Sequence, residues 1–137
     1  MTRINLVPPE ELYDQHILAE YREIRSLTRG LRRCFAGQRG AKKNDIPPKF
    51  TLNKGHVRFF LDKGLYIHNR YNLILDEMKS RGFKPQFDTI DISVWPDGYF
   101  NDWTPTDEDL ALIRGRIAEK IALKPHWYRY KGENIKC

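Results

Sequence analysis

The sequence predicts an all-α fold, a single compact domain over residues 1–137 with three main helices and long ordered loops. Three segments repeat apolar residues every three or four positions, which is the spacing of one buried helical stripe. No segment shows the strong alternation of apolar and polar residues that a half-buried strand requires. A length of 137 residues allows one hydrophobic core but is too short for two independent ones.

The first helix is expected to begin near Asp14, after a short helical start at Pro9, and to end near Phe35. Between residues 37 and 54 the chain is rich in Gly, Pro, Lys and Asn, and Pro47–Pro48 forbids a continuous helix. We therefore expect a loop there. The buried stripe of the first helix comprises Ile17, Tyr21, Ile24, Leu27, Leu31 and Phe35.

The second helix is predicted from Gly64 to Arg81, with Gly82 as a left-handed cap. Residues 83–105 mix Pro, Gly, Asp and aromatic residues and are expected to form a long irregular connection. The buried stripe of this helix comprises Ile67, Tyr71, Ile74 and Met78.

The third helix is expected to begin near Thr106, whose hydroxyl can cap it, and to end before Pro125. Three acidic residues follow Thr106 and complement the positive end of the helix dipole. The inner stripe of this helix comprises Leu110, Ile113, Ile117 and Ile121.

Composition narrows the class of function. Lys and Arg total 24 against 18 for Asp and Glu, and a net charge of +6 suits an anionic partner without proving one. The two cysteines and four histidines show no metal-ligand spacing, and no glycine-rich nucleotide loop occurs. We expect neither a metal nor a small-molecule cofactor. The sequence also has no apolar run that could span a membrane and no apolar signal core, so we expect an intracellular, non-secreted protein, in the cytoplasm or wherever the genome lies.

One side of the first helix is basic, because four other arginines and one glutamine fall within roughly 80° of Arg22 on a helical wheel. His16 and Glu23 lie two turns apart beside this stripe. A carboxylate among arginines stays ionised and weakens phosphate binding, so Glu23 suits catalysis better than pure DNA binding. The helix alone favours the alternative, a solvated basic face with a surface glutamate. The stripe comprises Gln15, Arg22, Arg25, Arg29, Arg32 and Arg33.

Two further features suit nucleic acid more weakly. Arg116, Lys120 and Lys124 share a face of the third helix, where DNA contact and a solvated face remain equally open. The aromatic tail with Trp127, Tyr128 and Tyr130 could stack on bases, although covering the core is favoured for Trp127.

The N-terminus is a candidate nucleophile. Thr2 is small enough to allow removal of Met1, which would expose an α-amine. Such an amine has a pKa of about 7.7–8.0, against about 10.4 for lysine, so it is partly neutral and can attack a sugar carbon to form an imine. Thr after Met is common, and the observation carries little weight alone. With Met1 attached, the amine of Thr2 would not be free.

Sequence islands in order along the chain resemble the phage endonuclease V family of pyrimidine-dimer DNA glycosylases. The family is all-α with three helices, in agreement with the fold predicted above. The islands are residues 1–6, Asp14-Gln15-His16, Ala19-Glu20-Tyr21-Arg22-Glu23, Gly55-His56-Val57-Arg58-Phe59-Phe60, Lys79-Ser80-Arg81-Gly82-Phe83, Glu119-Lys120-Ile121-Ala122 and Pro125-His126-Trp127-Tyr128.

This resemblance implies a bifunctional, metal-independent DNA N-glycosylase and apurinic/apyrimidinic lyase. Such an enzyme excises the 5′ base of a cyclobutane pyrimidine dimer and nicks the backbone by β-elimination through an N-terminal imine. The resemblance places the nucleophile at the amine of Thr2 and the catalytic carboxylate at Glu23. The implied partner is double-stranded DNA with UV photoproducts, and we expect a monomer.

Phosphate and lesion contacts follow from the same resemblance. Relatives often carry an arginine three residues after the catalytic glutamate, where this chain has Ser26, so either Arg25 or Arg29 would have to reach that phosphate. Two alternatives remain: a same-fold glycosylase and lyase for other damaged bases, and a non-catalytic basic DNA-binding module. The intact pair of Thr2 and Glu23 disfavours the second. The implied contact residues are Arg3, Gln15, His16, Arg22, Arg116 and Lys120.

Overall fold

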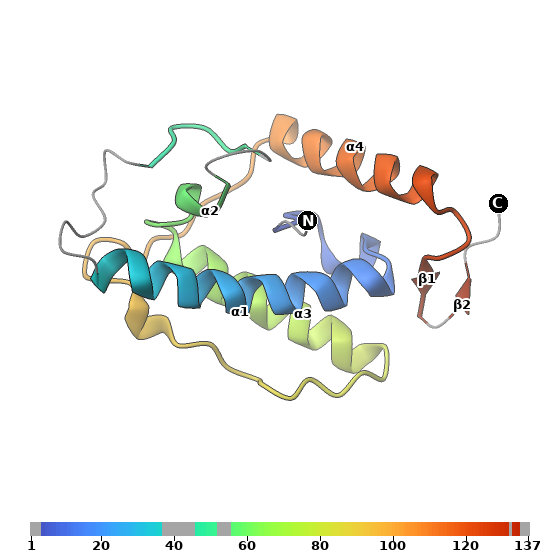
Figure 1. The fold of residues 1–137 in the computed structure, drawn as a ribbon, viewed down its shortest axis with the longest axis horizontal. Coiled ribbons are helices and arrows are strands. Elements are labelled where there is room, and N and C mark those ends of the chain that lie inside the picture. Colours follow the sequence, from blue (N-terminus) through green and yellow to red (C-terminus); the bar gives the residue numbers. More distant parts are fainter. Residues whose placement is uncertain (1–3, 37–45, 52–55, 132, 135–137) are drawn as a thin grey trace.

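The computed structural model describes residues 4–36, 46–51, 56–131 and 133–134. Helices α1 and α3 lie one behind the other along the length of the molecule, α4 lies above them, and the first described residues lie between α1 and α4 (Figure 1). The predicted all-α fold with three main helices is confirmed. The elements are η1 (Pro9–Glu11), α1 (Asp14–Ala36), α2 (His56–Phe59), α3 (Gly64–Ser80), η3 (Ile92–Val94), α4 (Asp107–Leu123), β1 (Arg129–Tyr130) and β2 (Glu133–Asn134).

The core lies between α1 and α3. Both predicted stripes are buried here, from Ile17 to Leu31 on α1 and from Ile67 to Met78 on α3, while the side chain of Phe35 lies outside the described residues. Full burial of one such aliphatic side chain stabilises the fold by about 1.5–3 kcal/mol. This interface therefore contributes strongly to stability, together with the buried residues of neighbouring segments that complete the core.

The end of α3 confirms the predicted glycine cap. The Phe83 N–H donates to the carbonyl oxygen of Met78 at 2.9 Å, and the Gly82 N–H donates to that of Lys79 at 3.1 Å. This pair of bonds is the Schellman motif, which needs a left-handed residue at its centre. Gly82 supplies it with φ of +87°.

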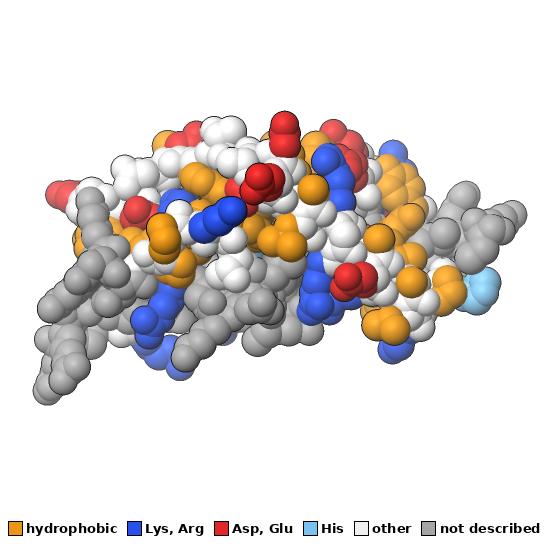
Figure 2. All heavy atoms as spheres, turned by 90° about the horizontal axis from the view of Figure 1, so that it is seen from above, with side chains coloured by type: hydrophobic (Ala, Val, Ile, Leu, Met, Phe, Trp, Pro, Cys, Tyr) orange, Lys and Arg blue, Asp and Glu red, His pale blue; other side chains and the backbone are white. Residues whose placement is uncertain are grey.

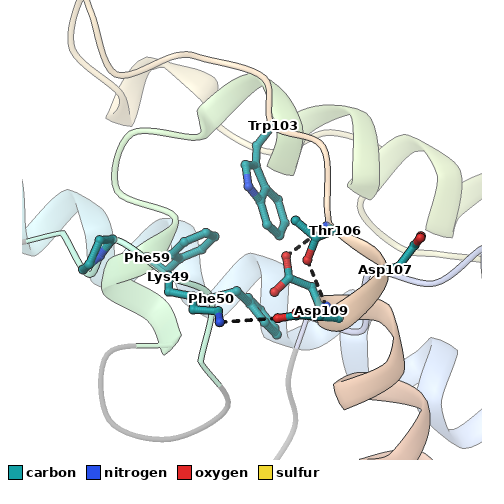
Figure 3. Close-up of a pocket in the computed structure, with 9 residues that line it drawn as sticks. Lys49, Phe50, Phe59, Trp103, Thr106, Asp107 and Asp109 are labelled. Atoms are coloured by element: carbon teal, nitrogen blue, oxygen red, sulfur yellow. Dashed lines mark hydrogen bonds and ion pairs between the residues drawn. The ribbon is translucent and has the colours of Figure 1, made fainter.

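The start of α4 is capped as predicted. The Thr106 hydroxyl oxygen accepts from the Asp109 N–H at 3.2 Å, and the Asp109 carboxylate accepts from the Thr106 N–H at 3.0 Å (Figure 3). Only Ile113 of the predicted inner stripe is fully buried, and the other three members are half-buried. Seen from above, charges of both signs and exposed hydrophobic atoms alternate over the surface (Figure 2). Helix α4 is thus attached less tightly than α1 and α3.

The connection over residues 83–105 is irregular, as predicted, apart from the single turn η3. The Tyr71 hydroxyl donates to the carbonyl oxygen of Phe87 at 2.6 Å, and the Phe87 N–H donates to the Tyr21 hydroxyl at 2.9 Å. The predicted loop at residues 37–54 falls mostly outside the described residues, and residues 46–51 have no helix or strand. The two-residue strands β1 and β2 pair antiparallel, and they are too short to give an alternating pattern.

Candidate active site

The segment of residues 4–7 is held by hydrogen bonds from three helices. The Ile4 N–H donates to Nε2 of His56 on α2 at 3.1 Å. The Asn5 N–H donates to Oε1 of Glu20 on α1 at 3.1 Å. Nη1 of Arg70 on α3 donates to the carbonyl oxygen of Val7 at 2.5 Å. The beginning of the described chain therefore has a fixed position beside α1.

A buried ion pair supports this segment. Arg70 Nε donates to Glu20 Oε2 at 2.6 Å and Nη2 to Oε1 at 3.1 Å, and the two side chains are 3% and 0% exposed. Burial opposes the guanidinium charge, but the adjacent Glu20 carboxylate outweighs it, so the pKa of Arg70 is raised. Removing either partner would leave an uncompensated buried charge.

Of the two predicted catalytic residues, Glu23 lies near this anchor. Glu23 is half-buried on α1, one turn after Glu20. Thr2 and Arg3, the predicted nucleophile and a predicted phosphate contact, lie outside the described residues. The segment that leads to them ends at the fixed Ile4.

His16 on α1 packs against aromatic side chains. Its ring stacks on Tyr128, with ring centroids 4.9 Å apart. Burial and the positive charge of Lys120 lower the pKa of His16 to about 4, against the opposing effect of Glu20. His16 is therefore neutral near pH 7, and in the free protein it can contact a phosphate only as a neutral hydrogen-bonding group.

Unpartnered polar atoms gather in this region. Among the described residues, both ring nitrogens of His16, Nε of Arg116 and Nδ2 of Asn5 are buried without a hydrogen-bond partner, as is Nδ1 of His68 on α3. Lys120 on α4 lies close enough to His16 for its positive charge to lower the pKa of His16. Because most buried polar groups in proteins are paired, such a set indicates a place where a ligand supplies the partners.

The arginines of the basic stripe on α1 have different environments in the structure. Arg22, Arg29 and Arg33 are exposed. Arg25 instead turns toward the 83–105 connection, with its guanidinium carbon 3.5 Å from the ring centroid of Phe87. Arg32 forms an ion pair with Asp91. Of the two candidates for the contact that Ser26 cannot make, Arg29 lies about 20° around the helix from Arg22 and is solvent-accessible.

Gln15 holds the C-terminal segment. Its Nε2 donates to the carbonyl oxygen of Trp127 at 2.6 Å, and its Oε1 accepts from the Arg129 N–H at 2.9 Å. The neighbouring Asp14 accepts from the Lys131 N–H at 2.9 Å. These bonds bring the aromatic residues at positions 127–130 to the start of α1.

The three aromatic candidates have different environments. Trp127 is 54% exposed, so the prediction that it covers the core is wrong. Tyr128 takes the buried place instead, because it fills the space against His16 and Tyr13. The Tyr130 hydroxyl donates to the carbonyl oxygen of Glu10 at 2.7 Å. A pocket of about 320 Å³ beside Trp127 is lined by Asp14, Gln15, Leu18, Phe83, Trp127 and Arg129.

A second pocket, of about 450 Å³, lies at the start of α4 (Figure 3). Phe50, Phe59 and Trp103 form its aromatic wall, and carboxylates from the first turn of α4 line its rim. The carboxylates disfavour phosphate, so we do not place DNA there. Within the described ranges, no group of three or more His, Cys, Asp or Glu is placed to hold a metal ion, and no helix is long and apolar enough to cross a bilayer.

Sequence reasoning did not assign a role to Glu20, Arg70 or His56. For Glu20 and Arg70 the sequence does carry a signal. Position 20 lies between the stripe residues of α1, and position 70 between those of α3, so each places a charge on a buried face. Opposite charges on two facing stripes predict a buried pair. The contact of His56 with Ile4 spans 52 positions and has no local signal.

A comparison with known protein families gives a match. The family model described as pyrimidine dimer DNA glycosylase matches residues 1–91. This match includes the N-terminal segment, α1 and α3, and therefore Glu23 and the whole buried anchor. The chain belongs to the pyrimidine dimer DNA glycosylase family, whose members are DNA repair enzymes.

Proposed function

We propose that this protein is a bifunctional DNA glycosylase and lyase that acts on cyclobutane pyrimidine dimers in double-stranded DNA. It works as a monomer and as one domain over residues 1–137, without a metal or a small-molecule cofactor. The observation that carries the proposal is the place of Glu23 on α1, one turn from Glu20, whose carboxylate anchors the start of the described chain through the Asn5 N–H.

The proposed nucleophile is the free α-amine of Thr2. Two residues of extended chain reach at most about 7 Å, so the anchoring of Ile4 limits where this amine can be. Glu23 lies one turn from Glu20, to which the Asn5 N–H is bonded. We assign to the Glu23 carboxylate the stabilisation of positive charge on the sugar and the removal of the sugar proton.

The proposed reaction balances without an oxidant or reductant. The amine attacks C1′ of the 5′ nucleotide, and the C1′–N1 bond breaks with its electron pair leaving on the base, which gains a proton. Loss of the amine protons and opening of the sugar ring give an imine. Removal of a C2′ proton then breaks the C3′–O bond and releases the 3′ phosphate. Water hydrolyses the imine and returns the amine.

The basic and aromatic residues are assigned to DNA binding. Arg3, Arg22, Arg116 and Lys120 contact phosphates, Arg29 replaces the contact that Ser26 cannot make, and neutral His16 donates or accepts one hydrogen bond. The exposed Trp127 is the residue available for stacking on a base. Gln15, Tyr128 and Tyr130 shape this surface through the contacts described above, and Arg25 supports it from the side through Phe87.

The test uses a duplex with one cyclobutane dimer, borohydride and excess chelator. We expect a covalent adduct, and digestion with mass spectrometry should place it on the N-terminal peptide. Strand cleavage should persist in chelator when borohydride is omitted. An adduct on an internal lysine would contradict the amine assignment. Cleavage that requires added magnesium would indicate a hydrolytic nuclease. A duplex with a ring-opened purine, run in parallel, tests the alternative substrate.

A further inference from the structure

His56 and the buried pair of Glu20 and Arg70 lie outside the proposed catalytic machinery, yet they make every side-chain hydrogen bond given above to the backbone of residues 4–7. All three side chains are buried, at 4%, 0% and 3% exposed respectively. They come from three different helices, α2, α1 and α3. We infer that these three residues are positioning residues, which fix the start of the chain so that its amine meets the sugar.

The tautomer of His56 follows from its partners. Nδ1 lies 2.8 Å from the carbonyl oxygen of Thr51, which can only accept, so Nδ1 carries the hydrogen. The neutral ring then has a lone pair on Nε2, and this lone pair accepts from the Ile4 N–H. The rings of Phe50 and Phe60 hold the imidazole edge-on at centroid distances of 5.4 and 5.5 Å. The acceptor for Ile4 is therefore fixed in position and in protonation state.

Residues 5–7 are held in place by the ion pair of Glu20 and Arg70. Leu6 has φ of +58°, in the left-handed region that a leucine rarely adopts, and the Val7 N–H bonds back to the carbonyl oxygen of Asn5. Arg70 donates to the carbonyl oxygen of Val7 while Glu20 accepts from the Asn5 N–H. Both ends of this turn are thus tied to one buried pair. The pair keeps the strained turn in place and sets the direction of the chain toward residues 1–3.

The inference rests on the proposed function, because positioning has a meaning only if the amine reacts. It adds that the rate of imine formation depends on the Ile4 N–H having an acceptor. A misplacement of about 1 Å can lower a rate by about 100-fold. A residue that only stabilises the fold would instead affect all activities together with the melting temperature.

Two substitutions of His56 separate these roles. In His56→Gln the side-chain oxygen can take the place of Nε2 and still accept from Ile4. In His56→Asn the amide can take the place of Nδ1 and still donate to Thr51, but nothing accepts from Ile4. His68→Asn is the matched control, because His68 is a half-buried histidine of α3 beside Phe100.

The measurement is the rate of borohydride trapping on a duplex with an abasic site, at saturating protein, with the dissociation constant for DNA measured separately. We expect His56→Asn to trap about 10- to 100-fold more slowly with DNA affinity unchanged, and His56→Gln to stay within about threefold of the unsubstituted protein. Equal rates for all three variants would overturn the inference. So would equal losses in the Asn and Gln variants that parallel their loss of melting temperature.

Amide hydrogen exchange at Ile4 gives a readout that does not need activity. Protection should be retained in His56→Gln and lost in His56→Asn. Protection retained in both variants would overturn the inference even if trapping changes. If the unsubstituted protein forms an adduct only on a lysine, the proposed function fails whatever the exchange result. A normal N-terminal adduct with no difference between the variants defeats the positioning role alone.

Discussion

The two faces of α1 meet their neighbours in opposite ways. Toward α3, apolar side chains are fully buried, and the buried charges of Glu20 and Arg70 satisfy each other. Toward α4, a single apolar residue of that helix, Ile113, is fully buried, and polar atoms of His16 and Arg116 lack partners among the described residues. The α3 face of α1 is complete in the free protein, in the sense that its buried ion pair is satisfied. The α4 face is incomplete, because it leaves polar groups without partners for a ligand to satisfy.

This difference separates stability from function along one helix. A complete interface can hold a strained turn and a buried ion pair without help from a ligand. An incomplete one costs stability, and such sites are expected where binding supplies the missing partners. The start of the described chain is anchored by the α3 face, through the bonds of Glu20 and Arg70 to residues 5 and 7. Substitutions on the two faces should therefore affect different measurements.

The largest effect is expected from Arg70→Ala on the α3 face. This change leaves the Glu20 carboxylate buried without its partner, which costs about 3–5 kcal/mol of unfolding free energy. Urea denaturation measures the loss. Replacing both residues by leucine removes the uncompensated charge and should restore most of the stability. A single variant as stable as the unsubstituted protein would show that the pair is not buried in solution.

Glu23→Gln should affect chemistry with little effect on the fold. Strand cleavage of dimer-containing DNA should fall by about 100-fold or more, because the proposed base and charge stabiliser is removed. DNA binding should be retained or become tighter, since a negative charge leaves a phosphate-facing surface. Cleavage and a binding titration are measured on the same duplex. Glu108→Gln, at an exposed position of α4, is the control, and equal rates in both variants would refute the assignment.

Two glycines contrast a closely packed position on α3 with an open, exposed one on α4. A Cβ at Gly64, at the start of α3, would lie 2.6 Å from side-chain atoms of Trp95 and Phe100, so Gly64→Ala should cost about 1–3 kcal/mol. A Cβ at Gly115, within α4, would meet nothing within 4 Å, so Gly115→Ala should stabilise by about 0.5–1 kcal/mol. Thermal unfolding of both variants measures the contrast. Loss of stability at Gly115 would mean that α4 is packed more tightly than described.

The sequence predicts the complete face far better than the incomplete one. Helical periodicity, the Gly82 cap and the Thr106 capping residue are local signals, and each is confirmed. The exposure of Trp127 depends on Tyr128 filling the space beside His16, and the different directions of Arg25 and Arg29 depend on where Phe87 lies. These contacts join distant segments, and helical periodicity carries no information about them.

The stability of the protein should depend on pH through His16, which lies on the incomplete face. Its pKa is lowered to about 4 in the folded protein, mainly by burial and then by Lys120, whereas an unfolded histidine has a pKa of about 6.5. Between these values the unfolded state binds more protons, so stability should fall as pH decreases from 6.5 to 4. The contribution is about 1–2 kcal/mol after screening of the partly exposed ring. Relative to the unsubstituted protein, His16→Phe should gain stability over this range and show no such gain at pH 8. A constant difference across pH would contradict the lowered pKa.

The smallest effect separates two arginines of α1. If Arg29 contacts a phosphate and Arg25 does not, Arg29→Ala should flatten the dependence of log affinity on log salt by about 0.9, and Arg25→Ala should leave it nearly unchanged. Between 50 and 200 mM salt that slope corresponds to a difference of about threefold in affinity. The basis is the guanidinium of Arg25, which lies on the Phe87 ring and would have to leave this contact to reach DNA. Arg25→Ala should instead lower the melting temperature through the lost contact.

Affinity for undamaged duplex is measured at four or more salt concentrations, since a phosphate contact acts on damaged and undamaged DNA alike. A flattened slope for Arg25→Ala with none for Arg29→Ala would exchange the two roles and place the DNA over the 83–105 side of α1.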